Sequence, residues 1–353
     1  MAEYRLEDIV KPLLEWYETH ARKLPWRENK NAYRIWISEI MLQQTRVEAV
    51  IAYYNRFLKE LPTVQDLAAC GDEQLMKLWE GLGYYSRARN LKKAAQVICT
   101  DYQGNFPTEF DVVVKLPGIG TYTAGAICSI AFEKKTAAVD GNVLRVITRL
   151  TADSTDIMDN KFREKMKREL EAVYPAGRCG DFTQSLMELG ATVCVPNGEP
   201  KCGQCPLSEL CLAFRKNQQA QFPVKKKKAE RKIVKKTVFL LCCGEEFAVR
   251  RREQEGLLGG MWEFPNVDKT VSIGEIREWL SQRGIVKADI GKPFEKKHIF
   301  THVEWHMKCF VVRCDVRGTD VEWNWVTKEQ LEGEIALPTA FKKVYEEGMK
   351  IGM

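Results

Sequence analysis

Two carboxylic acids of the 353-residue chain stand in surroundings that suit acid–base chemistry. Glu39 lies inside residues 33–45, a mostly apolar segment of helical length. Because a carboxyl group among Ile, Trp, Met and Leu is costly to ionise, we expect the pKa of Glu39 to rise toward the working pH, as a general acid requires. A glutamate on the one polar stripe of a buried helix would show the same pattern.

Asp140 is the second acid, within Val-Asp-Gly-Asn-Val at residues 139–143 and just before a predicted helix over 143–150. Aspartate commonly caps a helix in this position, and we expect capping to fix the carboxylate and keep it ionised. Cleavage of an N-glycosidic bond needs a proton donor for the departing base and an anion opposite the developing oxocarbenium ion, by analogy with the two-carboxylate glycosidases. Glu39 and Asp140 together can supply both.

Residues 116–120 (Leu-Pro-Gly-Ile-Gly) separate two predicted helices, at 109–115 and 121–132. Proline stops the first helix, and Gly118 and Gly120 permit positive φ in a tight turn. Such a turn points backbone N–H groups outward at a helix N-terminus, which suits a phosphate oxygen and carries no base-sequence information. Taken alone, the motif fits a purely structural connector equally well.

Four of the twelve cysteines form the pattern C-x7-C-x2-C-x5-C, namely Cys194, Cys202, Cys205 and Cys211. Four thiolates packed this closely indicate a metal, and the spacing alone does not separate zinc from an iron–sulfur cluster. The other eight cysteines are scattered among apolar neighbours, where we expect them to be buried.

The elements that must position these residues change along the chain. Apolar residues recur at helical spacing through residues 1–215, which predicts an all-α domain. Residues 225–236 hold eight Lys or Arg against one Glu, which predicts an exposed connector, either a solvated charge run or a phosphate contact. Beyond it, one helix around 272–282 and short β-rich runs predict an α+β domain; the runs are 237–242, 247–250, 306–313 and 321–326.

Composition limits the class of protein. The formal charge of +6 fits a nucleic-acid partner without requiring one. The first ten residues do not resemble a signal peptide, and no run of 18 apolar residues predicts a membrane span. We therefore expect a soluble, cytoplasmic protein with no membrane partner and no disulfide framework.

Several motifs, taken in order, resemble the MutY family of adenine glycosylases in the helix-hairpin-helix superfamily. They are Leu-Pro-Trp-Arg at 24–27, Trp-Ile-Ser-Glu-Ile-Met-Leu-Gln-Gln-Thr at 36–45, and the hairpin with Asp140 twenty residues beyond Gly120. The resemblance implies a monomer that hydrolyses adenine from double-stranded DNA where it faces 8-oxoguanine or guanine, in base excision repair. It implies that Glu39 protonates adenine at N7 and helps to activate water, while Asp140, next to Asn142, stabilises the sugar cation.

The resemblance also assigns residues that hold the flipped adenine and the opposite base. Trp26, Arg27 and Gln184 match positions that line the adenine pocket, and Gln44 and Tyr84 match positions that fill the gap in the base stack. Leu82 and Thr45 are expected near the oxidised guanine. Without the resemblance, Tyr84 and its neighbours are more simply interpreted as core tyrosines beside solvated arginines.

One position bears on the reaction type. Relatives such as endonuclease III carry a lysine two residues after the last glycine of the hairpin, where this chain has Tyr122. Without an amine at that position a Schiff-base lyase step is not expected, and the chain is predicted to be a monofunctional hydrolase with Tyr122 in its active site. The alternatives are an endonuclease III-like lyase and a catalytically silent binder of damaged DNA.

In this superfamily the cysteine loop holds a [4Fe–4S] cluster, usually with six residues in the first gap, where this chain has seven. The resemblance therefore implies such a cluster, with a structural and DNA-docking role. Residues 256–265 resemble the Nudix-like domain of the family. Ser281 and Gln282 stand where a working Nudix hydrolase has Mg²⁺-binding carboxylates, so nucleotide hydrolysis is not expected.

Phe300, Thr301 and His302 match the Phe-Ser-His loop that inspects oxidised guanine in the family, with Thr in place of Ser. An isolated His302 is otherwise an ordinary core or surface histidine. We expect three parts: a helical glycosylase domain at 1–216 with its cluster loop at 194–211, a basic connector at 217–232, and a Nudix-like domain at 233–353.

Overall fold

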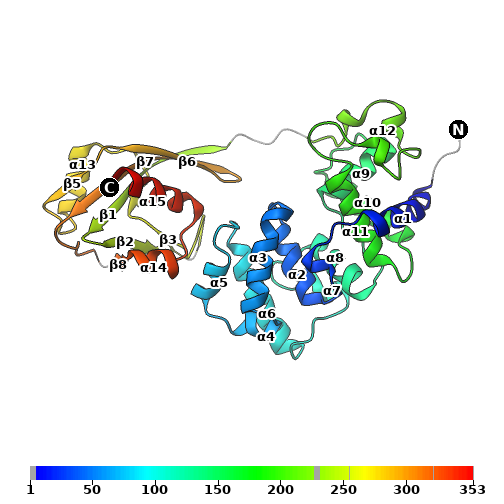
Figure 1. Ribbon diagram of the computed structural model, residues 1–353, viewed down its shortest axis with the longest axis horizontal. Helices are drawn as coiled ribbons and strands as arrows, with labels where there is room; N and C mark the ends of the chain where they lie inside the picture. The colour runs from blue at the N-terminus through cyan, green and yellow to red at the C-terminus, as the bar shows by residue number, and fades with distance from the viewer. Residues whose placement is uncertain (1–4, 226–230, 254, 321, 353) are drawn as a thin grey trace. The chain divides into compact units, whose positions relative to one another are not determined.

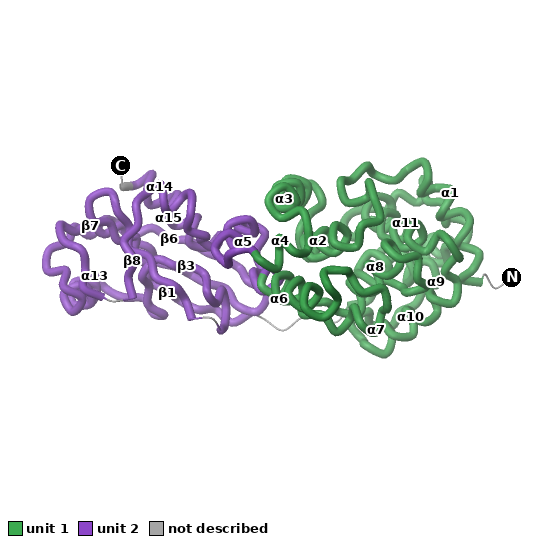
Figure 2. Tube along the Cα trace, turned by 90° about the horizontal axis from the view of Figure 1, so that it is seen from below, with its two compact units in different colours: residues 1–69, 89–227 green, residues 70–88, 228–353 purple. Residues whose placement is uncertain are grey.

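The computed structural model describes residues 5–225, 231–253, 255–320 and 322–352. The chain divides into two compact units, Met1–Ala69 with Arg89–Lys227, and Cys70–Ala88 with Lys228–Met353 (Figures 1 and 2). Parts of three predictions lie outside the described residues: 226–230 in the connector, Val321 at the start of a predicted strand, and residues 1–4 of the N-terminal segment.

The described part of the first unit is helical, as predicted. Its α-helices are α1 (Val10–His20), α2 (Ala32–Leu42), α3 (Val47–Glu60), α4 (Val64–Ala69), α6 (Ser86–Asp101, which begins in the second unit), α7 (Phe110–Val113), α8 (Thr121–Phe132), α9 (Gly141–Thr151), α10 (Asn160–Val173), α11 (Cys179–Thr192) and α12 (Leu212–Arg215). Its short 3-10 turns are η1 (Leu6–Ile9), η2 (Pro25–Arg27), η3 (Cys202–Gln204) and η4 (Gln219–Gln221).

Small residues let the central helices of this unit approach closely. Helix α11 packs on α8 and α9, and α2 packs on α8. A Cβ atom on Gly180 would lie 2.9 Å from the Cα of Ile130, and one on Gly190 would lie 2.6 Å from the Cβ of Asn142. Glycine is therefore required at both contacts. The first brings α8 against α11, and the second brings the N-terminal end of α9 against α11.

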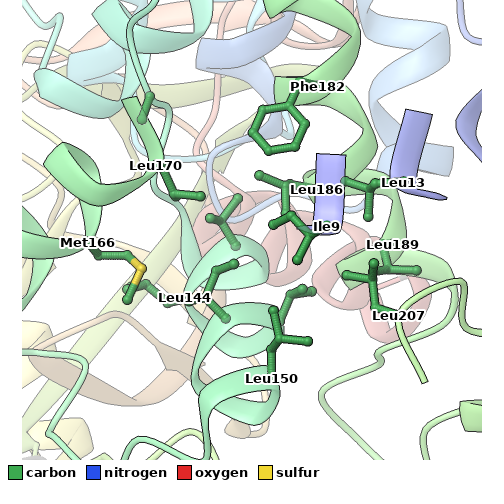
Figure 3. Packing of buried hydrophobic residues seen from close by; sticks show 14 of the residues in the cluster. Ile9, Leu13, Leu144, Leu150, Met166, Leu170, Phe182, Leu186, Leu189 and Leu207 are labelled. Carbon is green, nitrogen blue, oxygen red and sulfur yellow. The ribbon is translucent and has the colours of Figure 1, made fainter. Parts of the chain in front are cut away.

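A core of aliphatic and aromatic side chains holds these helices together. Leu13 from α1, Leu144 from α9, Leu170 from α10 and Phe182 from α11 belong to one buried cluster (Figure 3). Removal of this apolar surface from water is the main stabilising term for the first unit. Cys194, Cys205 and Cys211 pack against the edge of the same cluster.

The second unit is built on a mixed sheet. Its main path runs β3-β2-β1-β7-β5, with β4 on β1, β6 on β7 and β8 on β2. The strands are β1 (Lys232–Cys243), β2 (Glu246–Arg251), β3 (Trp262–Glu263), β4 (Asn266–Val267), β5 (Ala288–Ile290), β6 (Phe294–Ile299), β7 (Val303–Cys314) and β8 (Asn324–Thr327). Strands β1 and β7 are parallel, and the register pairs Lys232 with Val303 and Cys243 with Cys314.

Both faces of this sheet are buried. Leu240 of β1 faces a cluster with Phe341 of α15 (Thr339–Gly352) and Leu331 of α14 (Lys328–Gly333). Its neighbour Phe239 faces the opposite cluster with α13 (Ile273–Ser281). Successive strand residues point to opposite faces, so a strand covered on both sides is a continuous apolar run.

The predicted fold class is confirmed, an all-α part followed by an α+β part. The predicted helix around 272–282 is confirmed as α13, whereas α14 and α15, which follow the last strand, were not predicted. Helix α5 (Asp72–Leu78) also groups with the second unit. Strand β6 was not predicted. In the described part of the chain, none of the helices combines the length and apolar character that a membrane crossing requires.

Candidate active site

A cavity of about 500 Å³ opens in the first unit, bounded by η2, α2, α8, α11 and the start of α9. It brings together residues from five separate stretches of sequence. Nine of the predicted site residues line it: Trp26, Arg27, Glu39, Gln44, Thr45, Tyr122, Asp140, Asn142 and Gln184. Its size suits a small planar ligand with a few fixed polar partners.

Glu39 lies on α2. The N-cap of this helix is Asn31, whose side chain accepts a hydrogen bond from the N–H of Arg34. Glu39 is 5% exposed, and the Tyr122 hydroxyl donates to its Oε2 at 2.6 Å. The pKa of Glu39 is raised to about 7, mainly by burial. The nearby charge of Asp140 adds to the rise, whereas the Tyr122 hydrogen bond and the charge of Arg27 oppose it. The predicted rise in pKa is confirmed, and Glu39 can hold and release a proton near neutral pH.

Asp140 is the N-cap of α9, as predicted: its Oδ1 accepts from the N–H of Val143 at 2.8 Å. The Asn142 side chain donates to its other oxygen at 2.7 Å. Burial raises the pKa of Asp140, and the hydrogen bonds from Val143 and Asn142 and the charge of Arg145 oppose that rise. The cap hydrogen bonds favour the ionised form, as expected, but burial outweighs them, so the net shift of the Asp140 pKa is upward.

A further polar group on the cavity wall was not predicted. Glu188 of α11 is fully buried and accepts hydrogen bonds from Arg22 Nε at 2.6 Å and Arg27 Nη2 at 2.8 Å. Gln184 precedes it by one helical turn, so the two lie on the same face of α11. The missed signal is a carboxylate inside the mostly apolar run 182–190, the same pattern that drew attention to Glu39.

The hairpin before α8 has one glycine with positive φ. Gly118 has φ +76°, whereas Gly120 has φ −92° and ψ 177° and is the N-cap of α8. Of the two glycines that permit positive φ, only Gly118 therefore adopts it. Extended backbone at an N-cap is normal for any residue, and Gly120 still leads into a helix N-terminus with free N–H groups.

The four clustered cysteines line one small, mostly apolar cavity with Val146, Leu189 and Leu207. Arg149 Nη1 donates to Cys194 Sγ at 3.3 Å, and Gln219 Nε2 donates to Cys202 Sγ at 3.8 Å. N–H donors at sulfur stabilise thiolates. Among the described residues, no set of three or more His, Cys, Asp or Glu side chains is placed to hold a metal ion.

Comparison with known proteins decides the family. A model described as "HhH-GPD superfamily base excision DNA repair protein" matches residues 37–173, and one described as "NUDIX domain" matches 237–347. The chain is 35% identical to an adenine DNA glycosylase of Buchnera aphidicola, over 85% of each chain. The chain belongs to the adenine DNA glycosylase family. It is also 32% identical to the Mus musculus adenine DNA glycosylase, over 94% of this chain and 76% of that one.

A solved thermostable thymine-DNA glycosylase has the same fold as the first part of this DNA glycosylase. The two share 33% identity with a TM-score of 0.55, over 60% of this chain and 96% of the other. The predicted family and the predicted class of enzyme, a glycosylase, are thereby confirmed.

The second unit of this DNA glycosylase holds the remaining predicted residues. Phe300, Thr301 and His302 form the turn between β6 and β7, where the Phe300 N–H donates to the Val303 carbonyl at 2.8 Å. The hydroxyls of Thr301 and Tyr84 are hydrogen-bonded at 2.9 Å, although 217 residues separate them. Tyr84 is 44% exposed, so it is not the core tyrosine of the simpler interpretation, whereas Leu82 is buried.

Proposed function

We propose that this DNA glycosylase hydrolyses the N-glycosidic bond of adenine in double-stranded DNA where adenine faces 8-oxoguanine or guanine, as a step of base excision repair. The observation that carries the proposal is the meeting of Glu39 and Asp140 in one cavity, with the pKa of Glu39 raised to about 7. The relatives are named adenine DNA glycosylases, which indicates adenine as the base that is released. The 8-oxoguanine partner rests on the resemblance of Phe300–His302 to the loop that inspects this lesion.

Each carboxyl group has a separate task in the proposed reaction. Glu39, which holds a proton in part of the molecules at neutral pH, donates it to N7 of the flipped adenine, so that the base leaves as a neutral molecule. Asp140, fixed by Val143 and Asn142, faces the positive charge that forms at C1′. That positive charge favours the ionised form of Asp140. The ionised Glu39 then accepts a proton from the attacking water.

The described residues that line the cavity include no lysine, which supports simple hydrolysis. The hydroxyl of Tyr122 is hydrogen-bonded to Glu39 and cannot form a Schiff base. The product is an abasic site in an intact strand. An endonuclease III-like lyase would instead cut the strand in the same reaction.

Four groups of residues are proposed to hold the DNA. The N–H groups at Gly118 and Gly120 bind a backbone phosphate. Trp26, Arg27 and Gln184 bind the flipped adenine, and Gln44 and Tyr84 fill the gap in the base stack. Leu82 and Thr45 lie near the oxidised guanine. Phe300, Thr301 and His302 contact the 8-oxoguanine. The hydrogen bond between Thr301 and Tyr84 supports this role, because it places the loop beside a residue proposed to enter the base stack.

We also propose that Cys194, Cys202, Cys205 and Cys211 hold a [4Fe–4S] cluster. Four cysteines around one apolar cavity, with N–H donors at two of the sulfurs, suit such a group. When bound, the cluster would cross-link the loop 194–211 and leave no open position for a substrate. It has no part in the base-release step.

The experiment is base release from duplexes that differ only in the base opposite adenine. We expect free adenine from the 8-oxoguanine duplex and more slowly from the guanine duplex, none from a thymine duplex, and strand cleavage only after alkali. Strand cleavage without alkali would support the lyase instead, as would release of an oxidised pyrimidine from a further duplex that contains one. Binding without release of any base would support a silent binder.

A further inference from the structure

One wall of the base cavity carries two arginines and a single carboxylate. Arg22 follows α1, Arg27 lies in η2, and Glu188 lies on α11; all three line the same cavity as Glu39. The side chain of Glu188 is 0% exposed, that of Arg27 is 14% exposed, and that of Arg22 is 33% exposed. This is a largely buried ion group, and not a surface salt bridge of small energetic value.

Both oxygens of Glu188 are engaged. Oε1 accepts from Arg22 Nε at 2.6 Å and from the Arg22 backbone N–H at 3.2 Å. Oε2 accepts from Arg22 Nη2 at 3.0 Å and from Arg27 Nη2 at 2.8 Å. Burial raises the pKa of Glu188, but the hydrogen bonds and charges of the two arginines outweigh burial and bring the pKa below its ordinary value. Glu188 is therefore ionised.

Glu188 also determines where Arg27 stands. The other terminal nitrogen of Arg27, Nη1, donates to the Arg22 carbonyl at 3.2 Å, and its guanidinium lies 5.6 Å from the centre of the Tyr17 ring. Arg27 is thus held by α11, by the segment after α1 and by an aromatic face. Three side chains act on Glu39: Tyr122 of α8 by a hydrogen bond, and Asp140 and Arg27 by their charges.

We propose that Glu188 is a positioning residue for base release: it holds Arg27 at the base and cancels one of the two positive charges on this wall. The inference rests on the proposed function, because it concerns the departure of a protonated base. Two uncompensated guanidiniums beside a base that gains a proton would oppose the reaction. A fixed carboxylate between them lowers this electrostatic repulsion and needs no reorganisation during the reaction.

The test is Glu188→Gln, which keeps the size of the side chain and removes its charge. Single-turnover adenine release at pH 6 is expected to slow on the order of 10- to 100-fold, because Arg27 loses its fixed position. Duplex affinity is expected to change much less. The alkaline limb of the pH–rate profile is expected to move to lower pH, because the uncompensated Arg27 charge favours ionised Glu39.

Glu263 offers a matched control in the second unit. It is 2% exposed and also pairs with two arginines, Arg250 and Arg252. Glu263→Gln removes a buried carboxylate of the same kind, so it is expected to lower stability similarly and to leave the alkaline limb in place. A Glu188→Gln enzyme whose rate of adenine release and alkaline limb both match those of Glu263→Gln would overturn the proposal.

A double variant covers the case in which Glu188→Gln does not fold. Arg22→Gln combined with Glu188→Gln restores the charge balance of this wall and is expected to recover folding and part of the release rate. A folded double variant with no adenine release at all would contradict the proposal. Failure of the proposed function is separate, because in that case the wild-type enzyme itself releases no adenine.

Discussion

At the scale of single residues, the cavity gives its two carboxyl groups different environments. Glu39 is buried on α2 and accepts a hydrogen bond from the Tyr122 hydroxyl. Asp140 accepts hydrogen bonds from a backbone N–H and a side-chain amide. A proton therefore has a binding site on Glu39 near pH 7, and this difference assigns the acid in the proposed reaction.

Removal of the Tyr122 hydroxyl tests this assignment. The hydrogen bond from Tyr122 stabilises the ionised form of Glu39 and so lowers its pKa from the value that burial alone would give. In Tyr122→Phe the pKa of Glu39 is expected to rise above about 7, and the protonated acid to persist to higher pH. The wild-type rate of adenine release should fall about tenfold per pH unit above the pKa, and the variant's fall should begin at higher pH.

The measurement is single-turnover adenine release from pH 5 to pH 9.5 for both enzymes. If the alkaline limb of the Tyr122→Phe profile stays in place or moves to lower pH, Tyr122 does not act on the group whose ionisation limits the rate. The opposite shift expected for Glu188→Gln makes the two variants controls for each other.

The sequence predicted that Glu39 and Asp140 act together and missed the charged groups around them. Glu39 and Asp140 stand in short local motifs, which the resemblance to the family connects. Glu188 and Arg22 are 166 positions apart, and only the packing of α11 beside the end of α1 brings them together. The direction of the pKa shift of Asp140 was also missed, since the depth of burial of a cap depends on tertiary packing.

At the scale of elements, the hairpin before α8 provides a matched pair of glycines. A Cβ atom on Gly118 would lie 2.6 Å from the Cβ of Asn90, and its φ is +76°; a Cβ atom on Gly120 would have nothing within 4 Å. Gly118→Ala is expected to cost at least about 1–2 kcal/mol, from the left-handed backbone alone. Gly120→Ala is expected to cost less than about 1 kcal/mol.

Urea unfolding of the two variants, followed by circular dichroism of the helical unit, measures this difference. Equal destabilisation by both substitutions would mean that the hairpin does not have the conformation described. Phosphate binding is a separate property, tested by duplex affinity at several salt concentrations.

The elements differ in how strongly the sequence predicts them. Helix α8 was predicted at its observed bounds, since proline and glycine end the preceding turn and an apolar run follows. Strand β6 was missed because its sequence, Phe-Glu-Lys-Lys-His-Ile, is mostly polar and half of it is exposed. It forms because β7 offers it an edge, which is a property of the sheet and not of the segment.

At the scale of the whole molecule, the cysteine loop is expected to depend on its cluster. The segment from Cys194 to Gln221 has only short helical turns of its own, η3, α12 and η4. It packs against the core of the first unit through Leu207 and Leu210 and through Cys194, Cys205 and Cys211. Oxidative removal of the cluster is therefore expected to open this segment to proteases before the rest of the unit unfolds.

Limited proteolysis with mass spectrometry, before and after cluster removal, checks the expectation. New cleavage sites should lie between residues 194 and 221, and the second unit serves as the internal control. An unchanged cleavage pattern after complete loss of cluster absorbance would contradict the structural role. The two-part organisation was predictable from the change in composition near residue 217, whereas the grouping of Cys70–Ala88 with the second unit was not.

The most direct test of the central claim compares Glu39→Gln with the wild-type enzyme on an 8-oxoguanine:adenine duplex. The substitution keeps the size of the side chain and removes the proton donor. The account predicts a loss of single-turnover adenine release on the order of 10²- to 10⁴-fold, with duplex affinity retained. Adenine release by Glu39→Gln at the wild-type rate would contradict the assignment of Glu39 as the acid, and with it the proposed mechanism.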